Sequence, residues 1–71
     1  MEKINELTTI NIGDKIYAPK LDKYFNIVDY AYDDIFKDML ANLAPSSENT
    51  EERGFTATLK TLIELGYFKI N

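Results

Sequence analysis

The chain has 71 residues, a formal net charge of −4, and neither cysteine nor histidine. So short a chain predicts one domain over residues 1–71, and the two missing residue types exclude disulfides and the usual zinc sites. They also exclude a serine–histidine pair, a cysteine nucleophile and an imidazole base. Carboxylates, lysines and tyrosines remain as possible catalysts, but so short a chain can hardly hold a water-excluding pocket as well as its own core. We therefore expect a protein that is not an enzyme and has no cofactor.

Charge and hydropathy restrict the partners and the location. With twelve acidic against eight basic residues, direct binding to duplex DNA is disfavoured, because DNA-binding domains normally carry a basic stripe. The N-terminal MEKINEL lacks the apolar run of a secretory signal, and no apolar stretch comes near the roughly 20 residues that cross a membrane. We therefore expect a cytoplasmic protein that does not enter a membrane.

The small size of the core has a consequence for assembly. Hydrophobic burial and the cost of ordering the chain nearly balance in a domain of this size. Close packing or self-association must therefore supply the margin of stability, and a homodimer is one of the two outcomes that we expect.

The first predicted elements form a hairpin in residues 8–19, TTINIGDKIYAP. The threonine and isoleucine content and the alternation of side chains predict a strand before the glycine. Gly13 and Asp14 are typical of a turn. A second strand is expected to follow and to end at Pro19, which cannot donate to a β-ladder.

A third strand is predicted over residues 24–32, YFNIVDYAY, where the side chains alternate with period two. Phe25 and Ile27 are expected to face the core. The opposite face is then expected to carry Val28, Tyr30 and Tyr32, which must meet a helix, a second subunit or a partner.

The segment DDIFKDMLANLAP, residues 33–45, predicts a helix. Its apolar residues follow one stripe at the helical period, namely Ile35, Phe36, Met39, Leu40 and Leu43. Asp33 or Asp34 is suited to cap the first turn, where a carboxylate accepts a bond from an unpaired N–H. Pro45 is expected to end the helix.

A polar segment, SSENTEERG, predicts an exposed loop or one loose helical turn before a second helix. We expect this helix to have Thr56 as its N-cap and to end at Gly66, which suits a left-handed C-terminal position. The final residues, YFKIN, alternate and predict a closing strand. The predicted fold is α+β: a small antiparallel sheet of three N-terminal strands plus a short C-terminal strand, packed against two helices.

The stretch DYAYDDIFKD, residues 29–38, has four aspartates against one lysine and so carries −3. Calcium needs several oxygen ligands on a loop shaped by glycine, and this stretch contains no glycine. Acid–base chemistry needs a pocket that shifts pKa values, and nothing in the sequence predicts one. Capping and solvation of a helix start are therefore the favoured role of these aspartates, and we expect no metal.

The tyrosines of the same stretch favour a binding surface. Tyr30 and Tyr32 are expected on one face of a strand, joined by Tyr17 from the neighbouring strand, and tyrosine is typical of interface centres. The alternative is that the tyrosines pack beneath a helix and the aspartates only cap and solubilise. The expected protein-binding residues are Tyr17, Asp29, Tyr30, Tyr32, Asp33, Asp34 and Asp38, and the expected partner has a basic surface.

Residues 54–70, GFTATLKTLIELGYFKI, resemble the end of a winged-helix DNA-binding domain, in which a recognition helix of the T-L-x-x-L type runs into L-G-Y-x-K and a wing strand. The resemblance implies a transcription regulator whose recognition helix runs from Thr56 to Leu65. The chain departs from the pattern, because one strand rather than two follows the helix, and Lys60 is the only base of that helix.

The stretch IGDKIYAPKLDKYFNIVDY, followed by an acidic amphipathic helix and GF-T, is similar to small uncharacterised proteins encoded by bacteriophages. This resemblance assigns no residue a role, but it implies a phage or another mobile element as the source and inhibition of a host enzyme as the activity. Our leading hypothesis is a protein-binding module that acts on a host protein with a basic surface. The winged-helix regulator and a structural subunit of a homo-oligomer are the alternatives.

Overall fold

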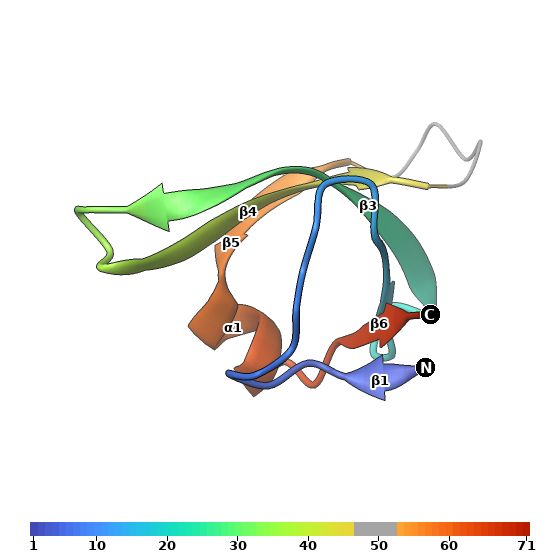
Figure 1. The fold of residues 1–71 in the computed structure, drawn as a ribbon. Helices are drawn as coiled ribbons and strands as arrows, with labels where there is room; N and C mark the ends of the chain where they lie inside the picture. The colour runs from blue at the N-terminus through green and yellow to red at the C-terminus, as the bar shows by residue number, and fades with distance from the viewer. Residues whose placement is uncertain (47–52) are drawn as a thin grey trace.

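The computed structural model describes residues 1–46 and 53–71, which form a six-stranded antiparallel sheet and one short helix (Figure 1). In chain order the elements are β1 (Glu2–Lys3), β2 (Lys15–Ala18), β3 (Lys23–Asp33), β4 (Asp38–Pro45), β5 (Phe55–Thr58), α1 (Leu59–Glu64) and β6 (Phe68–Ile70). The strand order in the sheet is β1-β6-β2-β3-β4-β5. The protein is therefore mostly β, and the predicted α+β fold with two helices is wrong.

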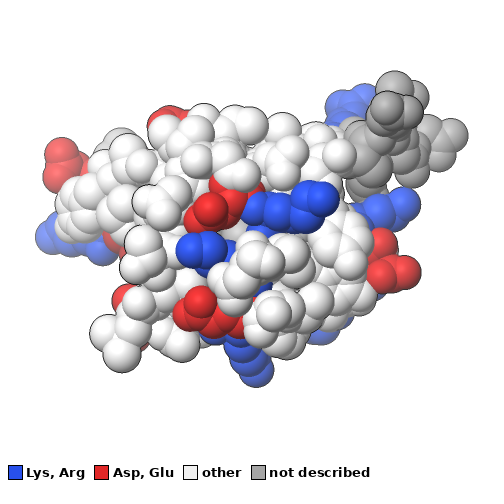
Figure 2. Space-filling model, turned by 45° about the vertical axis from the view of Figure 1, so that its right-hand side comes forward, with Lys and Arg blue, Asp and Glu red and all other residues white. Residues whose placement is uncertain are grey.

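The sheet bends around the interior of the molecule. β2 to β5 lie beside their neighbours in the chain, whereas β6 pairs with β2. α1 follows β5 on the open side of the bent sheet, from where the chain returns to β6 (Figure 1). On the side of the molecule shown in Figure 2, acidic and basic side chains lie next to one another rather than in large areas of one sign.

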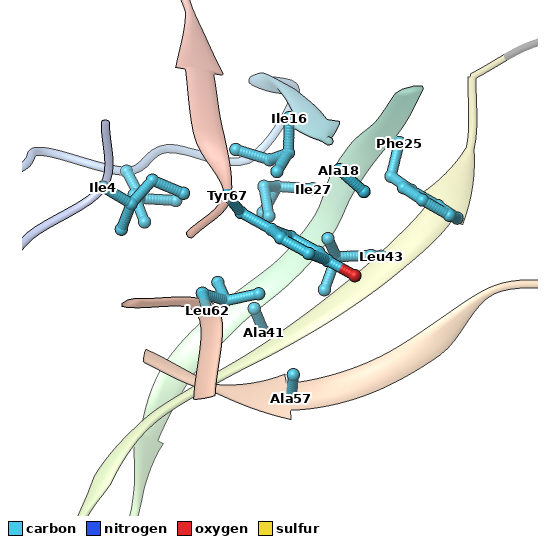
Figure 3. Packing of buried hydrophobic residues seen from close by; sticks show 11 residues of the cluster. Ile4, Ile16, Ala18, Phe25, Ile27, Ala41, Leu43, Ala57, Leu62 and Tyr67 are labelled. Carbon is cyan, nitrogen blue, oxygen red and sulfur yellow. The ribbon is translucent and has the colours of Figure 1, made fainter. Parts of the chain in front are cut away.

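Apolar side chains from β2 to β5, from α1 and from the segments beside β1 and β6 fill the interior (Figure 3). Phe25 and Ile27 of β3 are each 1% exposed, which confirms the predicted core side of the first part of that strand. The Phe55 ring packs edge-on against the rings of Phe25 and Tyr67, at centroid distances of 5.0 and 6.4 Å. The other buried apolar residues are Ile4, Ile10, Ile16, Ala18, Ala41, Leu43, Ala57 and Leu62.

Residues 33–45 form the end of β3, a turn and strand β4 instead of the predicted helix. The segment also fits period two, because Met39, Ala41 and Leu43 occupy alternate positions. β4 pairs with β3 on one side and with β5 on the other, so its backbone groups are satisfied in the sheet. The burial of Ala41 and Leu43, which are 0% and 2% exposed, adds contacts that override the helix propensity of the segment.

The second helix is shorter than predicted and starts later. Residues Phe55–Thr58 form β5, and α1 covers only Leu59–Glu64. The N-cap is Thr58, whose hydroxyl accepts the N–H of the residue three positions later. Thr56, the predicted cap, lies in β5, and its hydroxyl donates to the side-chain oxygen of Asn42 at 2.6 Å.

The other strand predictions are confirmed except for the first. Residues 8–12 are irregular, and the buried hydroxyl of Thr8 accepts a backbone N–H of the N-terminal segment there. β2, β3 and β6 lie where strands are predicted. Gly13 and Gly66 have the left-handed φ, 96° and 71°, that the predicted turn and helix end require. The predicted loop over 46–54 lies mainly outside the described residues.

Gly54 lies where the chain entering β5 comes very close to β4. A Cβ at this position would be 2.5 Å from the backbone oxygen of Leu43. We expect Gly54→Ala to lower the free energy of unfolding by on the order of 2 kcal/mol, because neither backbone can move without disturbing the ladder. Urea-induced unfolding followed by circular dichroism measures the change, and an unaltered midpoint would contradict the close approach.

Candidate functional site

The hairpin of β3 and β4 extends past the rest of the sheet (Figure 1). β2 pairs with β3 only along Lys23–Asn26, and β5 pairs with β4 only along Leu40–Leu43. Beyond those points, within the described residues, the two strands pair only with each other, up to the turn that joins them. We call residues 28–39 the hairpin arm. It contains the whole aspartate- and tyrosine-rich stretch, residues 29–38, that the sequence singles out.

A β-bulge at the base of the hairpin arm changes the alternation of β3. The register with β4 shifts between Ile27 and Asp29, so Val28 is an extra residue. One extra residue moves every later side chain to the other face of the strand. Val28 itself is 53% exposed.

Tyr30 and Tyr32 therefore lie on the same face as Phe25 and Ile27, and the predicted opposite placement is wrong. Tyr30 pairs with the buried Ala41 and packs against the core. Tyr32 lies two residues nearer the turn, past the end of the core, and is 60% exposed. The two tyrosines thus share a face, but only Tyr32 is largely available to a partner.

The turn at the end of the arm is ordered by Asp33 and exposes two apolar side chains. One carboxylate oxygen of Asp33 accepts the N–H groups of Ile35 and Phe36, at 3.0 and 2.8 Å. Lys37 closes the turn with a left-handed φ of 53°. Ile35 is 88% exposed and Phe36 is 62% exposed. We call Tyr32, Ile35 and Phe36 the apolar tip.

Asp38 connects the start of β4 to α1. Its carboxylate accepts the N–H of Met39 at 2.8 Å and that of Lys60, in the first turn of α1, at 2.9 Å. Asp38 therefore stabilises a helix start, although a different one from the predicted helix. Burial, followed by the nearby charge of Asp38, raises the pKa of Tyr30 above the ordinary tyrosine value.

The remaining predicted contact residues lie in two places. Asp29 and Asp34 lie exposed on the arm. Tyr17 lies on β2, where its ring packs on Tyr24 at a centroid distance of 4.9 Å and its hydroxyl donates to Asp22 at 2.7 Å. Because its cross-strand partner Tyr24 lies on β3 well before the arm, Tyr17 is about 20 Å along the sheet from the arm tyrosines. The prediction that Tyr17 joins them is not met.

An open groove lies along α1, with a volume of about 330 Å³. It is lined by Glu6, Asp38, Leu59, Lys60, Ile63 and Glu64. The Asp38 carboxylate is already bonded to the backbone of α1, so it is not directed at a ligand. Within residues 1–46 and 53–71, no group of three or more histidine, cysteine, aspartate or glutamate side chains is placed to hold a metal ion.

Comparison of the chain with protein-family models, with curated proteins and with solved structures found no match. In the part of the chain that the structure describes, no helix has the length and apolar character of a membrane span.

The apolar tip is the part of the site that sequence reasoning misses. From sequence, Ile35 and Phe36 are expected in the buried stripe of a helix, whereas both are exposed. A signal for the turn is present, because an aspartate that bonds the N–H groups two and three residues later is typical of turns. Read together with alternating residues on both sides, that signal predicts a hairpin.

The two bonds of Asp33 give a test of the turn. We expect Asp33→Ala to lower the free energy of unfolding by about 1–2 kcal/mol, because two N–H groups lose their acceptor. Asp34→Ala is the matched control, since it removes a neighbouring exposed carboxylate that makes no such bond. Urea unfolding of both variants measures the difference, and equal losses would contradict the role of Asp33.

The environment of Tyr30 predicts how stability depends on alkaline pH. Burial raises the pKa of Tyr67 as well as that of Tyr30, so both hold their protons more tightly in the folded state than in the unfolded state. The free energy of unfolding is therefore expected to fall as the pH rises above about 10, where unfolded tyrosine ionises. Tyr30→Phe/Tyr67→Phe should reduce this fall in urea unfolding experiments, and an unchanged slope would contradict the assignment.

Proposed function

We propose that the protein is a non-enzymatic protein-binding module that acts in the cytoplasm through the hairpin arm. The apolar tip inserts into a pocket of the partner, and a basic rim around that pocket faces the aspartates of the arm. Four aspartates against one lysine leave the arm with −3. The partner is thus a protein with a basic surface.

The observation that carries this proposal is an ordered turn with exposed apolar side chains. The bonds of Asp33 hold the backbone of the turn, so little conformational freedom is lost when a partner binds. Ile35 and Phe36, which are 88% and 62% exposed, leave most of their apolar surface in water. Burying one such side chain contributes about 1.5–3 kcal/mol, so the two together can form a binding hot spot.

The fold itself does not require these two side chains. Neither Ile35 nor Phe36 belongs to the core cluster or to the residues packed against it. Asp33 bonds their backbone N–H groups, which almost any residue would provide. Binding to a partner accounts for two large apolar residues at a position where folding does not select them.

The DNA-binding alternative has little support in the described residues. α1 is six residues long, and the element before it is strand β5 rather than the first helix of a helix pair. On the face shown in Figure 2, basic side chains lie among acidic ones, whereas binding to DNA phosphates requires a continuous basic stripe. Protein contact is therefore the function that the geometry supports best.

Affinity capture from lysate of the source organism, read by mass spectrometry, tests the proposal. We expect Ile35→Ser/Phe36→Ser to retain at least about tenfold less of the partner, because both apolar anchors are lost. Leu7→Ser/Ile12→Ser is the matched control, since it removes two apolar side chains outside the arm that are 92% and 66% exposed. Circular dichroism and urea unfolding check that both double variants fold.

The same experiment has outcomes that contradict the proposal. Equal retention of the partner by the arm variant and the control would reject the apolar tip as the binding site. Retention that disappears with nuclease would favour nucleic acid. Retention of the protein's own chain alone, with a mass of twice 8.2 kDa in solution, would replace the proposal with a homo-oligomer.

A further inference from the structure

Among the described strands, none pairs with one edge of the hairpin arm. On this edge of β3, pairing with β2 ends at Asn26, and the last backbone bonds are those of Ile27. The N–H of Ile27 donates to the backbone oxygen of Asp14 at 2.8 Å, and the backbone oxygen of Ile27 accepts the N–H of Gly13 at 2.7 Å. Residues 28–33 pair with β4 along one edge, and no described strand lies along the opposite edge, where β2 has ended. Since an antiparallel strand directs alternate N–H and C=O groups to each side, some of these groups lack a strand partner.

Exposed strand edges are usually protected against pairing. Charged side chains, proline, a short length and β-bulges are common means of protection. The open edge over residues 28–33 contains neither proline nor lysine, and its charged residues are Asp29 and Asp33, which repel acidic strands but not basic ones. The bulge lies at its first residue and leaves the others in regular register with β4. The edge therefore offers a regular template for one more strand.

The two faces of this edge carry different side chains. Strand alternation places Asp29, Ala31 and Asp33 on one face and Tyr30 and Tyr32 on the other. In the turn, Asp33 uses only one of its two carboxylate oxygens. An added strand would therefore meet two carboxylates four residues apart on one face and two tyrosine rings on the other.

We infer that the open edge of β3 binds an extended segment of the partner with basic residues at positions n and n+4 and apolar residues at n+1 and n+3. Backbone hydrogen bonds to residues 29–33 supply affinity that is independent of sequence. The basic pair is complementary to Asp29 and Asp33, and the apolar pair packs beside Tyr30 and Tyr32. This inference rests on the proposed function and adds to it the chemical class of the partner.

A second copy of the chain fits the same edge poorly. An antiparallel pair of arms centred on Ala31 would use the whole regular stretch and would place Asp29 of each copy opposite Asp33 of the other. Like charges directly opposite one another destabilise a sheet. Each arm would also bring −3 to the interface. Charge complementarity therefore selects a basic segment rather than a second copy.

The probe is a synthetic peptide, Thr-Lys-Val-Thr-Val-Lys-Thr, whose two lysines and two valines have the inferred spacing. We expect its titration to change the backbone NMR shifts of residues 28–33 and to slow hydrogen exchange of alternate amides there, because a new ladder protects them. A peptide with both lysines replaced by glutamate, and an N-methylated peptide that cannot donate to a ladder, should each bind at least about tenfold more weakly.

Two variants with the same change of charge locate the binding site on the protein. Asp29 lies on the open edge and Asp34 in the turn, and both are exposed. We expect Asp29→Lys to weaken binding of the lysine peptide by about tenfold, and Asp34→Lys to weaken it much less. Circular dichroism checks that both variants fold.

Several outcomes would overturn the inference. These are no binding of the lysine peptide, equal weakening by the two charge variants, or binding without slower exchange in residues 28–33. In each case the proposed function would stand or fall on the capture experiment with Ile35→Ser/Phe36→Ser, because the apolar tip can hold a partner without the edge. Slow exchange of the same amides that appears only at high protein concentration, without peptide, would replace the inferred partner with a second copy.

Discussion

The length of β3 relative to its neighbours is the constraint on which the rest of the structure depends. β3 has 11 residues, whereas β2, beside its first part, has 4. The first part of β3 therefore lies between two strands and contributes Phe25 and Ile27 to the core. The last part has a described strand on one side only, and the bulge at Val28 separates the first part of β3 from the last. The first part of β3 thus builds the core, and its last part carries the proposed binding surface.

The fold could be predicted from sequence where the order of apolar and polar residues fits either the strand period or the helical period, but not both. β2, β3 and β6 alternate, and Gly66 marks the end of the helix, because left-handed backbone favours glycine. Residues 38–45 fit both periods, so local pattern leaves the choice open. Pairing with β3 and β5 decides it, and β5 follows only after residue 54. Long-range partners of this kind are not contained in a short window of sequence.

The candidate site was predictable in its residue types and less so in its geometry. Six of the seven expected residues lie in the hairpin arm, whereas Tyr17 lies on β2. Asp33 bonds N–H groups two and three residues later, and the same chemistry serves a helix cap or a turn, so it does not distinguish them. The bulge has no local signature either, and strict alternation therefore assigns Tyr30 to the wrong face.

The pairing of β1 with β6 has a consequence for the connectivity of the chain. Glu2 lies opposite Lys69, so both termini lie beside each other, on the side of the molecule away from the hairpin turn (Figure 1). Adjacent strands are about 5 Å apart, a gap that a few glycine and serine residues can span. A linker of that length could join β1 directly to β6, and the backbone could be reopened at the turn between β2 and β3, without altering the strand order. The fold is therefore suited to circular permutation.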